Sequence, residues 1–210
     1  MSKSRVEAVS DGVFAIAITL LVLTLGEPDD YAHLARQLAD RWPSLAAYVV
    51  SFAIIGIMWL NHHSIFDRFE RIDRALFYLN LLLLMTVAFL PYPTGVLGQA
   101  LRRGQGARTA AVFYSVAMTT NAYAWGALWL YASGHRRLLE PSFPEPERRT
   151  ATLLFTSGTV AYTLSIAVAL VSAYACLAFH AILALYYALD PLGRRVSRHT
   201  DSPRTPTRVG

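Results

Sequence analysis

The chain has 210 residues, of which 54% are hydrophobic and only 16% are charged. A soluble domain usually carries about 25% charged residues, so this composition argues against an ordinary soluble enzyme and against a disordered chain. The formal net charge is +5. No recognition motif and no basic stretch interleaved with aromatic residues accompanies that charge, and we therefore expect no nucleic-acid partner.

The charged residues leave long gaps between them. Uncharged stretches of 15, 25, 27, 27 and 40 residues follow Asp11, Arg41, Arg74, Arg108 and Arg149. A helix crosses the ~30 Å hydrocarbon core of a bilayer with about 20 residues. Three stretches fit one crossing each, the longest fits two, and the first is a few residues short. Because a backbone in lipid must satisfy its own hydrogen bonds, the sequence predicts an all-α integral membrane protein with six transmembrane helices.

The expected spans follow in chain order. They cover residues 6–25, 44–61, 75–90 and 110–131, and two more share 151–189. The third is expected to stop at Pro91 and Pro93, and the last two are expected to turn near Ser172. Residues 1–190 are thus the predicted six-helix domain. Residues 191–210, rich in Arg, Ser, Thr and Pro, are predicted to be a disordered basic tail in the cytoplasm.

The basic residues indicate the orientation. With the N-terminus inside, the inner segments hold 14 Lys and Arg residues and the outer loops hold 5. Positive charge is enriched on the cytoplasmic side of membrane proteins. Both termini are therefore predicted to be cytoplasmic, and this bias also accounts for the net charge.

The first span carries an unusual charge. Its uncharged part covers only ~22 Å, so the helix must extend backward through Ser10 and Asp11 towards Arg5. A charge within the membrane costs ~2.5–3.5 kcal/mol unless it is paired or hydrated. Asp11 therefore either has partners on neighbouring helices or lies at the headgroup boundary.

The same span presents an apolar stripe. Ile16, Leu20 and Leu23 are spaced i, i+4 and i+7, and Thr19 lies beside them. Such a stripe either lines a hydrophobic constriction where copies of the helix meet or packs against neighbouring helices, as most apolar stripes do.

Two motifs resemble one known family. The segment from Arg5 through Val9-Ser10-Asp11 to Leu23 resembles the first-helix signature of the transmembrane protein 175 family, lysosomal potassium channels with bacterial relatives. The family pattern is Arg-x-x-x-Phe-Ser-Asp, and Val9 stands where the aromatic residue is usual. The stretch Trp59–Phe66 resembles the family's Trp-x-x-His-His-x-x-Phe motif. Together the motifs cover about 27 of 210 residues.

This resemblance implies a potassium-selective channel. Members with one six-helix unit are tetramers in which four first helices surround the ion path, without the Thr-Val-Gly-Tyr-Gly filter of ordinary potassium channels. The family's constriction carries over onto Ile16, Leu20 and Leu23, and its selectivity threonine onto Thr19. A polar network on the cytoplasmic side carries over onto Arg5, Ser10, Asp11, Trp59 and His63.

The expected partners are further copies of the chain, the bilayer and monovalent cations, in the inner (plasma) membrane of a cell. No cofactor beyond permeant K⁺ and no metal site is expected, since adjacent His62 and His63 point to different helix faces and lack further ligands. Asn80, Asn121 and His180 are interpreted as packing or hydrogen-bonding residues within the membrane.

Two other classes stay open. A secondary transporter or proton-leak pathway would use the same helices, but such proteins usually show charges at the membrane midplane, and the mid-span segments here have none. An intramembrane enzyme would need a nucleophile and a base within reach. Only Ser64 beside His63, or Ser172 near His180, hint at one, and no enzyme is expected.

Overall fold

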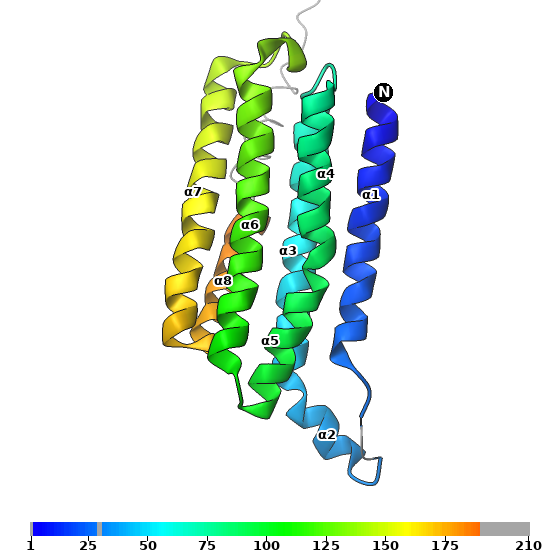
Figure 1. Ribbon diagram of the computed structural model, residues 1–210, viewed down its shortest axis with the longest axis vertical. Coiled ribbons are helices and arrows are strands. Elements are labelled where there is room, and N and C mark those ends of the chain that lie inside the picture. The colour runs from blue at the N-terminus through cyan, green and yellow to red at the C-terminus, as the bar shows by residue number, and fades with distance from the viewer. Residues whose placement is uncertain (1, 29–30, 190–210) are drawn as a thin grey trace, which may run out of the picture.

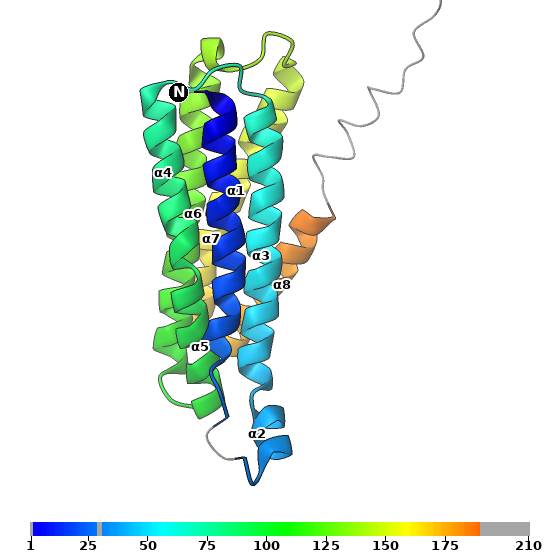
Figure 2. The same cartoon turned by 90° about the vertical axis from the view of Figure 1, so that its right-hand side faces the viewer.

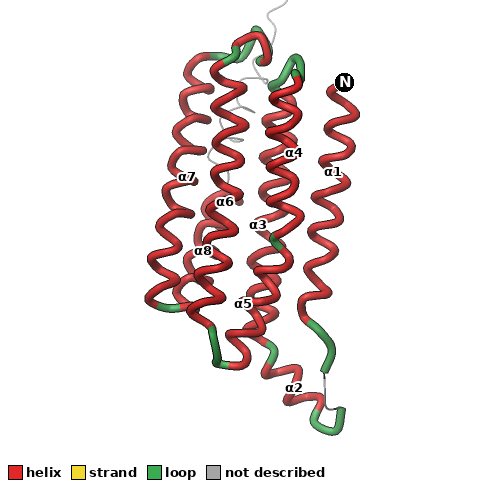
Figure 3. The backbone as a smooth tube through the Cα atoms, viewed as in Figure 1, coloured by secondary structure: helices red, strands yellow, loops and turns green. Residues whose placement is uncertain are grey.

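A computed structural model describes residues 2–28 and 31–189 of the chain. In these residues the regular structure is helical, and the helices run side by side as an elongated bundle with short connections (Figures 1 and 3). The predicted tail, 191–210, lies outside the described residues. We refer to the end of the bundle where α1 begins as the N-terminal end, and to the opposite end as the α2 end.

The first helices agree with the charge-free stretches but are longer. Helix α1 covers Lys3–Leu20 and continues as a 3₁₀ turn, η1, over Leu21–Leu25, so the predicted backward extension past Asp11 is confirmed. A short helix, α2 (Leu34–Asp40), follows outside the main bundle. Helix α3 then covers Trp42–Asp67. The longer helices arise because flanking polar residues continue the helix beyond its apolar part.

The third span does not stop at its prolines, and the expected end there was wrong. Helix α4 (Arg74–Phe89) passes through Leu90, which keeps helical backbone angles, into α5 (Pro91–Arg103). Proline is tolerated in the first turn of a helix, where its missing N–H is not needed. The carbonyl of Val87 accepts from the Leu90 N–H instead, at 3.1 Å. The pair therefore continues along the bundle through a one-residue joint.

The remaining helices pair closely. Helix α6 covers Ala107–Gly134, α7 covers Glu145–Val171, and α8 covers Ala173–Ala188. The predicted turn is confirmed: Ser172 is the single residue between α7 and α8. Its extended backbone breaks the helix, and its hydroxyl accepts from the N–H of Ala175 at 3.3 Å, which caps α8.

Four described segments are long and apolar enough to cross a bilayer: Lys3–Leu25, Trp42–Asp67, Arg74–Arg103 and Glu145–Val171. Helix α6 is long enough, but its Ser, Thr and Asn side chains lower its hydropathy, and α8 is shorter. The chain is therefore an all-helical membrane protein with at least these four membrane-capable helices.

Helix α6 forms the centre of the core. It packs against α4, α5, α7 and α8, and it contributes the fully buried rings of Tyr114 and Trp129. Helix α1 instead packs against α3 and α4 at the edge of the bundle, where Figures 1 and 2 show one of its faces without a helical neighbour. This peripheral place leaves α1 free to meet another molecule.

Candidate pore helix and its anchoring network

Helix α1 has one buried and one exposed face. Val6, Ser10, Phe14, Ala17 and Leu21 follow a helical repeat and are buried against α3 and α4. Their small and medium side chains let the helix lie close to its neighbours. This spacing fixes the rotation of α1, and so determines which of its residues point away from the bundle.

The predicted constriction residues lie on the exposed face. Ile16 is 59% exposed and Leu23 is 72% exposed, and Leu20 and Val9 share that side of the helix. Thr19 is also exposed, and its hydroxyl donates to the carbonyl of Ile16 at 2.9 Å. That bond holds the side chain against its own helix, with the oxygen still able to accept another bond.

Asp11 has a partner on α3. The indole Nε1–H of Trp59 donates to Asp11 Oδ1 at 2.9 Å, and the Trp59 ring stacks on His63 with centroids 6.4 Å apart. His63 Nε2 lies 3.7 Å from Asp67 Oδ2. Three predicted network residues thus meet at the exposed junction of α1 and α3. Arg5 is exposed, and no described side chain pairs with its guanidinium.

Ser10 belongs to a second, buried network rather than to the Asp11 cluster. Its hydroxyl donates to the carbonyl of Val6 at 2.8 Å, so its oxygen accepts from Asn80 Nδ2 at 3.0 Å. The other end of the Asn80 amide, Oδ1, must then accept, and His62 Nε2 lies 2.9 Å away. His62 therefore carries its proton on Nε2.

This second network joins three helices. It links α1, α4 and α3 through Ser10, Asn80 and His62, which are all fully or nearly fully buried. The expected interhelical role of Asn80 and the structural role of His62 are confirmed. What sequence reasoning missed is the pairing of Ser10, since the motif groups it with Asp11 although adjacent residues face different sides of a helix.

A buried arginine fastens the other end of α1. Arg41, only 6% exposed, donates from Nη1 to the carbonyls of Leu25 at 2.7 Å and Gly26 at 2.9 Å, and from Nη2 to that of Glu27. Gly26 has a positive φ of 62°, which turns its carbonyl towards the guanidinium. Sequence reasoning counted Arg41 only as an outer-loop charge, because these partners are backbone atoms.

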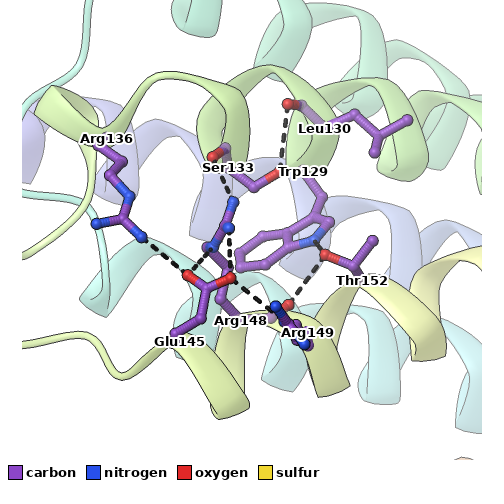
Figure 4. Close-up of polar contacts among 8 residues, drawn as sticks. All are labelled: Trp129, Leu130, Ser133, Arg136, Glu145, Arg148, Arg149 and Thr152. Carbon is purple, nitrogen blue, oxygen red and sulfur yellow. Dashed lines mark hydrogen bonds and ion pairs between the residues drawn. The ribbon is translucent and has the colours of Figure 1, made fainter.

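Charged groups also tie α6 to α7 at the N-terminal end. Glu145 accepts from Arg148 at 2.7 and 3.0 Å and pairs with Arg136 at 2.9 Å and Arg149 at 3.4 Å (Figure 4). Arg148 also donates to the carbonyl of Ser133 at 3.0 Å. The cluster cross-links the loop between α6 and α7, so several arginines behind the charge bias also have a structural role.

Asp73 forms a cap at the same end. Its Oδ1 accepts from the N–H of Leu76 at 2.9 Å at the start of α4, and its Oδ2 accepts from the hydroxyl of Tyr131 at 2.9 Å, with Arg137 at 3.5 Å. The N–H bond, followed by the tyrosine bond and the arginine charge, lowers the pKa of the Asp73 carboxyl below its ordinary value. The ionised form is thus favoured in the folded protein.

Asp73 is expected to make folding stability depend on acid. Because its pKa is lower folded than unfolded, its contribution is complete above the ordinary carboxyl pKa, about 4, and is lost as the pH falls through the folded value. Thermal unfolding of the purified protein between pH 7 and pH 3 measures this effect. The variant Asp73→Asn should be less stable at pH 7 and show a smaller fall in melting temperature; an equal fall in both proteins would contradict the assignment.

Known proteins place these features in a family. The model of the family described as endosomal/lysosomal potassium channel TMEM175 matches residues 5–91, which hold both networks. A potassium channel of Streptomyces collinus is 47% identical over 188 residues, covering 89% of this chain and 91% of its own length. The human endosomal/lysosomal proton channel TMEM175 is 42% identical over 101 residues, 43% of this chain and 20% of its own length.

The fold has a solved relative. The crystal structure of a lysosomal potassium-selective channel TMEM175 homolog from Chamaesiphon minutus superimposes with a TM-score of 0.81 at 38% identity, covering 89% of this chain and 96% of that one. Because relatives above 30% identity match over most of both chains, the resemblance extends well beyond the two motifs. The chain belongs to the TMEM175 family of cation channels.

Proposed function

We propose that the chain is a potassium-selective channel in which four copies bring their α1 helices together around one pore. The observation that carries this proposal is the exposed apolar face of α1, with Ile16, Leu20 and Leu23 on the side that has no neighbour within the protomer. In water or lipid alone this face gains nothing from its fixed rotation. In a fourfold assembly the same face surrounds the axis.

The apolar rings would control the flow of ions. Ile16 and Leu20 narrow the path and expel water from it, which blocks hydrated cations until the α1 helices separate. Leu23 narrows the path again towards the α2 end. The path needs no carbonyl filter of the ordinary kind, and no cofactor beyond the permeant ion itself.

The two networks would hold this helix in place. The Trp59–Asp11 bond and the Ser10–Asn80–His62 chain fasten α1 to the bundle, so that its apolar face keeps its direction when the subunits move. Arg5 stays exposed on the same helix, and we propose that it completes the Asp11 cluster across the subunit boundary. The networks then belong to the cytoplasmic side, with six crossings per subunit and both termini inside the plasma membrane of the cell.

Thr19 is proposed to favour potassium over sodium. Its hydroxyl oxygen keeps a free lone pair, so four copies would contribute a ring of acceptors to a partly hydrated K⁺. We expect Thr19→Ala to reduce the K⁺/Na⁺ permeability ratio severalfold while leaving K⁺ flux present. Reversal potentials under bi-ionic conditions measure the ratio, with Thr163→Ala, an exposed threonine of α7, as control. An unchanged ratio would remove Thr19 from the selectivity step.

The function is tested by flux from liposomes. Purified protein should release K⁺ down an imposed gradient without a coupled ion, at a rate that rises with the gradient, and cross-linking should give tetramers with Ile16 on the axis. The runner-up, a secondary transporter or proton leak, predicts saturating flux that depends on a proton gradient. Protein that passes no K⁺ under any gradient would sink the channel proposal.

A further inference from the structure

A cavity opens inside the bundle on the side away from the exposed face of α1. It has a volume of about 90 Å³, is partly open, and lies among α3, α6, α7 and α8. Most of its wall is apolar, with Ile54 and Met58 on α3, Trp125 on α6 and Phe155 on α7. Its opening follows from the length of α8, which ends well before the N-terminal end of α3 (Figure 2).

One buried polar atom in this cavity lacks a partner. Asn121 lines it from α6 and is fully buried, and its Oδ1 accepts no hydrogen bond from the described residues. The orientation of the amide is fixed by α4. The hydroxyl of Thr86 donates to the carbonyl of Leu83 at 2.7 Å, so its oxygen must accept from Asn121 Nδ2 at 2.8 Å. Oδ1 is therefore the end left unsatisfied.

A buried acceptor without a partner is costly in an apolar interior. The cavity offers two more polar groups, the amide of Asn61 and the hydroxyl of Tyr162. Apolar walls with a few polar groups facing one space are typical of small-molecule sites. The occupant that fits this chemistry has an apolar body and a group that both donates and accepts a hydrogen bond, which is a hydroxyl.

The size of the cavity restricts the occupant further. An enclosed apolar cavity that binds benzene measures about 150 Å³. The present cavity is smaller but partly open, so the hydroxyl end of a chain enters it while the rest of the molecule lies in the opening. The walls belong to membrane-capable helices α3 and α7, and the supply is therefore the bilayer rather than water.

We propose that this cavity binds a single-chain amphiphile with a terminal hydroxyl, an alkanol-type molecule that enters from the lipid and donates its proton to Asn121 Oδ1. Tyr162 or Asn61 then donates to the hydroxyl oxygen. The site is separate from the exposed face of α1, and it does not depend on the proposed function.

The site is tested by photolabelling of the full chain in lipid vesicles. The probe is 1-octanol with a diazirine on its chain, and the control probe is octane with the same diazirine. The octanol probe should label the cavity wall, such as Met58 or Phe155, about threefold to tenfold more than the octane probe does, which is the gain of one hydrogen bond. Exposed Leu164 on α7 should be labelled equally by both probes.

Two substitutions sharpen the result. Ala184→Leu fills the cavity from α8 and should abolish the labelling of its wall, while Ala188→Leu, exposed on the same helix, should leave it unchanged. Asn121→Leu should remove the preference for octanol. Equal labelling of the wall by both probes in the unmodified protein, or labelling confined to exposed residues, would overturn the proposal and leave a hydrated cavity instead. Either outcome leaves the K⁺ flux test unaffected.

Discussion

Replacing Ile16 by alanine is expected to raise passive K⁺ efflux from liposomes about tenfold or more. Ile16 is one of the most exposed large side chains of α1. If four copies surround a pore, the substitution removes three carbon atoms from each wall and lets water enter the narrow point. A tenfold rise requires the barrier to fall by only about 1.4 kcal/mol.

A matched control separates the pore from a general loss of packing. Ile182 on α8 is 65% exposed, close to the 59% of Ile16, and the proposed assembly leaves it away from the axis. Ile182→Ala should therefore leave K⁺ efflux unchanged. If both variants raise efflux equally, the protein is leaking through a damaged bundle. If neither does, Ile16 does not form the constriction.

Much of the fold follows from where charges are absent. An uncharged stretch long enough to cross a bilayer has few alternatives to a helix, and Ser172 ends α7 as expected because the stretch of 40 residues is too long for one crossing. The extension of α1 past Asp11 was also predictable, since the uncharged part alone is too short. These features depend on chain length and hydrogen bonding of the backbone.

Contacts between distant residues were harder to predict. Pro91 was expected to end a helix, but the neighbouring helices α3 and α6 hold α4 and α5 in line, and the carbonyl of Val87 finds another donor. Ser10 was grouped with Asp11 by the motif, although the rotation of α1 places it against Asn80. Each outcome was decided by packing partners far away in the sequence, which a single sequence does not reveal.

Arg41 is the other residue at which substitution should have a large effect. Its guanidinium binds three consecutive carbonyls, of Leu25, Gly26 and Glu27, that follow the end of η1. The planar fork of arginine reaches several acceptors at once, and lysine offers only a single charged centre. Arg41→Met leaves these carbonyls without their partner, which should lower the free energy of unfolding by about 3 kcal/mol. Arg41→Lys should lie between the two.

The same loss should disturb the proposed pore. Leu23 lies on the 3₁₀ turn that Arg41 fastens, so a loosened turn would no longer hold that side chain at a fixed distance from the axis. We expect Arg41→Met to lower the melting temperature and to raise K⁺ efflux together. Arg36→Met provides the control, because Arg36 is exposed and only 4.0 Å from Asp40 in a surface pair, which contributes little. If Arg41→Met changes stability but not efflux, the clamp supports the bundle without setting the width of the pore, and the outer constriction must be assigned elsewhere.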